Sequence, residues 1–185
     1  MTPVDVTVLL SGGLDSAACV AFFLSEFHRV RALHIDYGQP AAAQELSAAR
    51  AIAEHFCVDF TVLKFGGCAL KTPGCIRGRN ALLLLVALME AQTRSGIVGI
   101  GIHKGSPYYD CSNNFLSTIQ RLFDNYTDGS FLVSAPFIEW EKAAIWAFCQ
   151  AKSVPVSLSY SCEKGTDPPC GNCLSCQDME ALRGR

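Results

Sequence analysis

Short apolar runs alternate along this chain with longer segments whose apolar residues recur at helical spacing. The first run, residues 4–10, is rich in β-branched side chains and ends at a Ser-Gly-Gly turn. Residues 14–27 then follow the pattern of an amphipathic helix. The same succession predicts strands at residues 30–35 and 58–63, with an alanine-rich helix at residues 40–56 between them.

The second half of the chain continues this alternation after a loop rich in Gly and Pro. The pattern predicts strands at 97–102 and 131–137, and helices at 80–94, at 139–151 and in a segment that ends near Tyr126. Strands that alternate with helices of ten or more residues are typical of βαβ units. We therefore predict an α/β fold, a doubly wound parallel sheet with helices on both faces. Residues 1–160 would form this domain, and residues 161–185 a small C-terminal extension packed on it.

Composition narrows the classes of protein that the chain can belong to. Its 185 residues are the size of one domain, and with 50% hydrophobic residues they can bury a sizeable core. The 15 Lys and Arg residues against 17 Asp and Glu give a net charge of −2, which argues against nucleic acid as a partner. The longest apolar run, residues 81–89, is too short to cross a bilayer. We expect no membrane association, a cytoplasmic location and a homodimer.

The first turn carries a motif suited to anion binding, Ser11-Gly12-Gly13-Leu14-Asp15-Ser16. It lies where a doubly wound fold places its ligand, between the end of a strand and the start of a helix. Glycines allow close approach of the backbone to a phosphate, and the helix N-terminus offers unpaired N–H groups. Asp15 would repel a phosphate unless a hard cation such as Mg²⁺ lies between them, so the motif predicts a magnesium–phosphate complex. A simple strand-to-helix turn with a serine cap is the alternative.

Four cysteines near the C-terminus predict a metal site. Cys162, Cys170, Cys173 and Cys176 could close a tetrahedral, structural Zn²⁺ site, whereas the other six of the ten cysteines are scattered. An iron–sulfur cluster, or four unrelated thiols, would also fit the spacing.

SGGLDS resembles the pyrophosphate loop of the N-type ATP pyrophosphatases, whose fold is that of the adenine nucleotide alpha hydrolases. Four motifs together, in order along nearly the whole chain, resemble the 7-cyano-7-deazaguanine synthase family: SGGLDS, Asp36-Tyr37-Gly38-Gln39, Gly78-Arg79-Asn80, and the cysteine loop that begins at Ser161. The resemblance implies a ligase that adenylates 7-carboxy-7-deazaguanine with ATP and converts it with ammonia to the amide. A second ATP-dependent step would give the nitrile, and both would release AMP and pyrophosphate.

The resemblance also implies roles for individual residues. Ser11 to Ser16 would bind the ATP phosphates, and Asp36 and Tyr37 the adenosine. Lys142 matches the lysine that contacts phosphate in this superfamily, although a solvated lysine is an adequate alternative. Arg79 could serve the same anion or contact helix carboxyl ends. Asp110 is a further catalytic candidate, because residues 106–111 stand where the family has its Gly-Tyr-Pro-Asp-Cys substrate loop.

The chain departs from the family pattern near the expected substrate. Pro40 and the alanines after it replace a histidine, and Glu163 replaces a tyrosine. One alternative is therefore a diverged member that transfers the activated carboxylate to another amine, including one on a protein. A second is a non-catalytic zinc module that binds RNA or a partner. A sulfur transferase that uses Cys68, Cys75 or Cys111 is weaker, and His103 is a candidate base.

Overall fold

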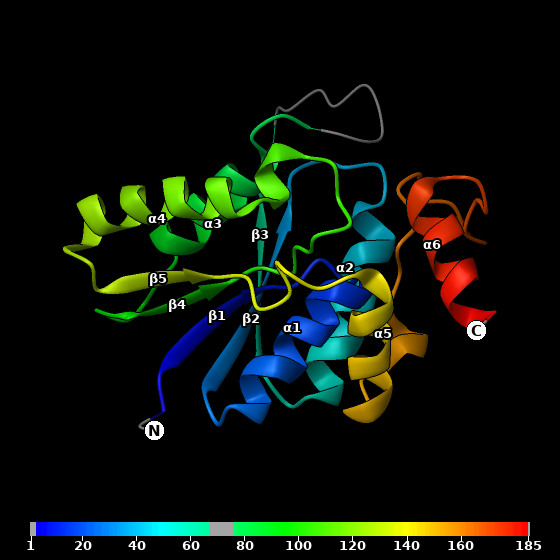
Figure 1. Ribbon diagram of the computed structural model, residues 1–185, viewed down its shortest axis with the longest axis horizontal. Helices are drawn as coiled ribbons and strands as arrows, with labels where there is room; N and C mark the ends of the chain where they lie inside the picture. The colour runs from blue at the N-terminus through cyan, green and yellow to red at the C-terminus, as the bar shows by residue number, and fades with distance from the viewer. Residues whose placement is uncertain (1–2, 67–75, 185) are drawn as a thin grey trace.

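The structure, a computed structural model, describes residues 3–66 and 76–184. A sheet of five parallel strands runs through its centre in the order β3-β2-β1-β4-β5 (Figure 1). The strands are β1 (Asp5–Leu9), β2 (Arg29–Asp36), β3 (Asp59–Lys64), β4 (Gly96–Gly99) and β5 (Phe131–Ser134). β1 pairs with β2 on one side and with β4 on the other. The connections after β1 and β3 therefore lead to opposite sides of β1, which makes the carboxyl end of β1 a topological switch point. Ligands of open α/β sheets bind at such a switch point.

Helices cover both faces of the sheet. They are α1 (Leu14–Ser25), α2 (Ala42–His55), α3 (Arg79–Met89), α4 (Asn113–Thr127), α5 (Lys142–Ala151) and α6 (Leu174–Arg183), with short 3₁₀ turns η1 (Tyr109–Cys111) and η2 (Val156–Leu158). In Figure 1, α3 and α4 lie on one face, α1, α2 and α5 on the other, and α6 stands beside the domain. The predicted doubly wound α/β fold is confirmed.

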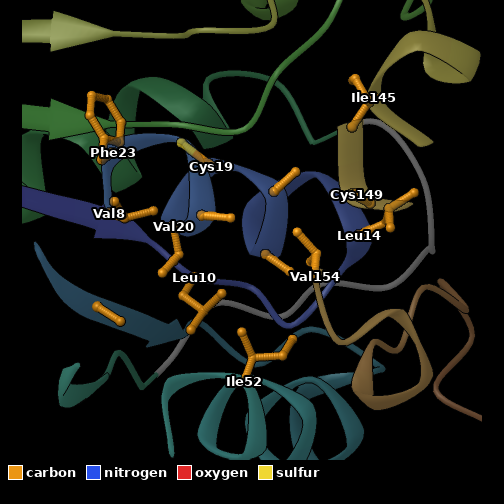
Figure 2. Packing of buried hydrophobic residues seen from close by; sticks show 14 of the residues in the cluster. Val8, Leu10, Leu14, Cys19, Val20, Phe23, Ile52, Ile145, Cys149 and Val154 are labelled. Atoms are coloured by element: carbon orange, nitrogen blue, oxygen red, sulfur yellow. The ribbon is translucent and has the colours of Figure 1, made fainter. Parts of the chain in front are cut away.

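Two apolar cores lie on the two faces of the sheet, as alternation along buried strands requires. Val6 and Val8 belong to one core together with residues of α1, α2 and α5. Figure 2 shows side chains of this core around α1, with Ile52 of α2 and Ile145 of α5 on either side of the helix. Leu9 faces the second core, which α3 and α4 complete with Leu84 and Phe123.

Several elements are shorter than the sequence predicts. The strands expected at 97–102 and 131–137 end at Gly99 and Ser134. Ile100 and Ile102 are buried all the same, so their apolar character reflects a core-covering loop rather than a strand. The helix expected at 80–94 ends at Met89, and the helix expected at 139–151 begins only at Lys142. Two turns precede Lys142. They are closed by hydrogen bonds from Ile138 N to Ala135 O and from Trp140 N to Phe137 O.

Three further expectations concern membrane association, cellular location and domain boundaries. Within the described ranges, no helix combines the length and the apolar character that crossing a membrane requires. The cytoplasmic location and the domain boundary at residue 160 stay predictions. Cys68 and Cys75 lie outside the described residues.

Candidate active site

The glycine turn fits tightly between the end of β1 and helix α2. Gly12 has φ +91°, and a Cβ atom at this position would lie 2.5 Å from the carbonyl oxygen of Glu45 and 2.9 Å from the amide nitrogen of Ala49. Only glycine suits both this backbone conformation and this close approach. Ser16 Oγ donates to Gly13 O at 2.9 Å, while no side chain caps the N-terminus of α1 at Gly13. The first N–H groups of α1 are therefore available to an anion.

The structure brings Asp15 and Lys142 together from opposite ends of the chain. Lys142, the first residue of α5, donates from Nζ to Asp15 Oδ2 at 2.5 Å across 127 residues of sequence. The other carboxylate oxygen, Asp15 Oδ1, is buried and has no hydrogen-bond partner among the described residues. A buried carboxylate oxygen without a partner is costly unless a cation or a donor supplies one. This atom fits the Mg²⁺ ion that the motif predicts.

His103 completes this cluster from the loop that follows β4. Its Nε2 lies 3.9 Å from Asp15 Oδ2, and its Nδ1 accepts a hydrogen bond from Gly105 N at 3.1 Å. An acceptor role for Nδ1 leaves the proton of the neutral ring on Nε2, facing the carboxylate. Burial lowers the pKa of His103, and the negative charge of Asp15 opposes that effect only in part. A neutral imidazole therefore stands beside the Asp15–Lys142 pair.

A second polar group lies at the carboxyl end of β2, where adenosine is predicted to bind. Asp36 Oδ1 accepts from Gly38 N at 3.0 Å, and Tyr37 N donates to Gln39 Oε1 at 2.9 Å. Gln39 Nε2 then donates to Glu45 Oε2 at 2.7 Å. Burial raises the pKa of Glu45 and that of Tyr37, the latter opposed by nearby Arg79. Arg79 therefore lies close to the Tyr37 side chain, and its role in binding the anion stays a prediction.

Asp110 occupies a structural position that the motif alone does not reveal. Its Oδ2 lies 3.4 Å from Asn80 N at the start of α3, and Asn80 Nδ2 donates to Asp110 O at 3.0 Å. Asn80 is 3% exposed, and its Oδ1 accepts from Arg79 Nε at 3.2 Å. Asp110 thus joins the predicted substrate loop to the segment that carries Arg79. A catalytic role for Asp110 stays a prediction.

A cavity of about 450 Å³ lies along the loop that also carries His103. Its wall consists of the loop after β4 and the turn before α5: Lys104, Ser106, Pro107, Tyr108, Tyr109, Cys111, Ser112, Asn113, Ile138 and Glu139. The predicted substrate loop, residues 106–111, supplies half of this wall. The cavity is within the size range of small-molecule sites.

The four C-terminal cysteines converge as predicted. Their sulfur atoms all lie within 4.8 Å of one another, and Cys170 Sγ and Cys176 Sγ are 4.0 Å apart. Tetrahedral coordination with Zn–S bonds near 2.3 Å requires sulfur atoms about 3.8 Å apart. Cys162 Sγ also accepts a hydrogen bond from Cys170 N at 3.4 Å, which favours a thiolate. The donor set therefore fits a closed zinc site.

The cysteine loop and the segment before it contact the glycine turn and the start of α2. Tyr160 N donates to Gly12 O at 2.9 Å, and a Cβ atom on Gly165 would lie 2.2 Å from Pro40 O. Glu163 Oε1 accepts from Ser175 Oγ at 2.9 Å and so ties the loop to α6. Pro40, one of the departures from the family pattern, thus packs against the cysteine loop, whereas Glu163, another, joins that loop to α6.

A family model described as "Queuosine biosynthesis protein QueC" matches residues 5–71 and 71–182. The chain belongs to the QueC family. This QueC family member is 32% identical to the 7-cyano-7-deazaguanine synthase of Synechococcus sp. (strain CC9605), with 94% of this chain and 89% of the relative covered. It is also 32% identical to the 7-cyano-7-deazaguanine synthase of Aquifex aeolicus (strain VF5), over 97% and 96% of the two chains.

A solved structure of NMN synthetase from Francisella tularensis has a TM-score of 0.60 to this QueC family member. The two chains are 17% identical, and the match covers 98% of this chain and 77% of the other. At this identity the likeness concerns the fold, which agrees with the predicted ATP pyrophosphatase architecture. Membership of an enzyme family over most of the chain leaves the hypothesis of a non-catalytic zinc module without support.

Proposed function

We propose that this chain converts 7-carboxy-7-deazaguanine, ATP and ammonia to 7-cyano-7-deazaguanine through the amide, with release of AMP and pyrophosphate. The observation that carries the proposal is the Asp15–Lys142 pair at the glycine turn, located at the switch point of the sheet. Its place is the one at which a doubly wound fold binds nucleotide phosphates. Family membership supports the substrate and the product.

The nucleotide end would activate the carboxylate. Ser11, Gly12, Gly13, Leu14 and Ser16 form the turn that would hold the phosphates against the first N–H groups of α1. Asp36 and Tyr37 at the end of β2 would contact adenosine. A carboxylate is a poor electrophile, and transfer of AMP to its oxygen turns that oxygen into part of a good leaving group.

Cationic groups would stabilise the pyrophosphate as it leaves. Mg²⁺, bound through Asp15 Oδ1, would supply charge neutralisation between the carboxylate and the phosphates. Lys142 and Arg79 are the basic side chains that we assign to the same anion. The pairing of Lys142 with Asp15 holds its ammonium group at the mouth of the turn before ATP arrives.

The zinc site would have a structural role. Four thiolates fill a tetrahedral coordination sphere, so no position is left for a substrate or a water molecule. The hydrogen bond from Tyr160 N to Gly12 O joins the segment before Cys162 to the phosphate-binding turn. We assign zinc the task of fixing the cysteine loop and α6 against the turn and the start of α2.

We also propose that two copies of the chain associate through the face formed by α3 and α4. Leu122 and Tyr126 lie one turn apart on α4 and are exposed at 36% and 74%, and Leu82 of α3 is exposed at 42%. Burial of such side chains against a second copy would favour association. Light scattering should give twice the chain mass, and Leu122→Glu should reduce it to the monomer; a monomeric wild type would refute the proposal.

The position of ATP cleavage tests the proposed activity. AMP and pyrophosphate should form only when 7-carboxy-7-deazaguanine is present, because the carboxylate is the group that attacks the α-phosphate. Chromatography of the nucleotide products measures this. ADP and inorganic phosphate as the products, or AMP formation at the same rate without the acid, would refute the proposal.

A further inference from the structure

We propose that Glu139 binds the N1–H and 2-amino edge of the deazaguanine base in the cavity between residues 104–113 and the turn before α5. This inference rests on the proposed function, because it takes a 7-deazaguanine acid as the substrate. It assigns a specificity-determining role to a residue that no motif in the sequence identifies.

Two chain segments that line the cavity also lead to residues of the proposed active site. Lys104 lies in its wall and directly follows His103, whose Nε2 is 3.9 Å from Asp15 Oδ2. Glu139 lies in the same wall three residues before Lys142, which contacts Asp15. Asp15, His103 and Lys142 do not themselves line the cavity, so the inference requires the carboxyl group of a bound acid to extend from the cavity toward them.

The wall has the composition that a purine-like base requires. Tyr108 and Tyr109 supply aromatic rings, and bases stack on such rings in protein sites. Tyr109 packs edge-on against Phe115 with ring centroids 5.9 Å apart, so α4 supports this ring. The volume of about 450 Å³ accommodates a two-ring base with a carboxyl substituent.

Glu139 is the one carboxylate among the residues that line the cavity. A guanine-type six-membered ring presents two adjacent N–H donors, N1–H and the 2-amino group, and a carboxylate presents two acceptor oxygens at matching spacing. Asn113 Nδ2 donates to Glu139 Oε1 and so orients the carboxylate. Within the described part of the chain Glu139 forms no ion pair, so its charge is available to a ligand.

Paired substrates test the inference. We compare kcat/KM for 7-carboxy-7-deazaguanine with that for 7-carboxy-7-deazahypoxanthine, which lacks the 2-amino group, in the wild type and in Glu139→Gln. The wild type should prefer the guanine form by about 10- to 100-fold, the range for loss of one good bidentate contact. Glu139→Gln should lose most of this preference through a higher KM for the guanine form, because its amide nitrogen cannot accept from the base.

Glu141→Gln is the matched control. Glu141 is also exposed and lies two residues away, but it is not part of the cavity wall. It should keep the wild-type preference. Unchanged discrimination between the two acids in Glu139→Gln, or an equal loss of discrimination in Glu141→Gln, would overturn the role of Glu139. In that case, AMP formation by the wild type would still support the proposed function. A wild type that turns over neither acid would overturn both.

Discussion

The residues of the nucleotide end gain their chemistry from partners distant in the sequence. Asp15 holds Lys142 with one carboxylate oxygen and leaves the other without a partner among the described residues. The pair keeps a lysine ammonium group at the glycine turn, where both side chains are only about one-fifth exposed, at 23% and 22%. Limited contact with water would strengthen the attraction of this group for a leaving pyrophosphate, the role that we propose for it.

Replacement of Lys142 tests this electrostatic role. Lys142→Met should reduce the rate of AMP and pyrophosphate release by about 10²–10³-fold, the usual effect of removing one group that stabilises transition-state charge. Steady-state kinetics with saturating acid measures the loss. Lys152, exposed at the other end of α5, is the control, and Lys152→Met should keep the wild-type rate. A Lys142→Met enzyme with full activity would remove Lys142 from the site.

The sequence predicts some of these residues better than others. The SGGLDS turn is recognisable because a local motif carries its chemistry, and Lys142 because it matches a superfamily position. The network of Gln39 and Glu45, and the contact between Asn80 and Asp110, form between segments that only the folded chain brings together. No spacing of residues in the sequence indicates these contacts. Each becomes evident only in the folded chain, where a buried polar side chain meets its partner.

At the scale of elements, the glycine turn depends on its packing against α2. The strain of a left-handed backbone alone costs on the order of 1–3 kcal/mol. Gly12→Ala should destabilise the protein by more than this, because the Cβ atom of the alanine would also lie 2.5 Å from the backbone of α2. Gly129, with φ +72° and nothing within 4 Å of its Cβ position, is the control for strain alone. Chemical denaturation compares the two variants. Equal losses of stability would show that the close contact is not limiting.

The cysteine loop is the second element whose role can be measured. Cys173→Ser should reduce bound zinc well below one ion per chain and increase amide hydrogen exchange in α6 and the glycine turn, because coordination fixes the loop against both. Elemental analysis and exchange mass spectrometry provide the two readouts. Exposed Cys57, outside the cluster, is the control. Full loading with zinc after Cys173→Ser would contradict the assigned ligand set.

Within the described residues, the type of the five strands and of helices α1 to α5 was predictable, whereas element ends were not. The alternation of buried strands and helices is a property of the pattern, but strand β4 ends where pairing with β5 ends, at Gly99 and Ser134. Apolar residues continue beyond both ends because the loops that follow also cover the core. Hydropathy reports burial, and hydrogen bonding between strands decides where a strand stops.

At the scale of the whole molecule, the sheet order places the residues of the proposed nucleotide and acid sites at one edge of the sheet. The carboxyl ends of β1 and β2 carry the residues proposed to bind the nucleotide, while the loops after β4 and β5 supply His103, Lys142 and the cavity wall. All four strands are parallel, so these loops lie at the same edge of the sheet. Transfer of AMP to a carboxylate requires this proximity.

The most direct test is the mass of the product made from 7-carboxy-7-deazaguanine, MgATP and ammonium by the purified full chain. The account predicts the amide first and then 7-cyano-7-deazaguanine, with one AMP released at each step. Purified amide supplied with MgATP alone should also give the nitrile. Failure to convert the acid at all, or conversion that yields ADP, would contradict the account. Accumulation of the amide without nitrile would instead identify a diverged enzyme that only activates the carboxylate and transfers it to an amine.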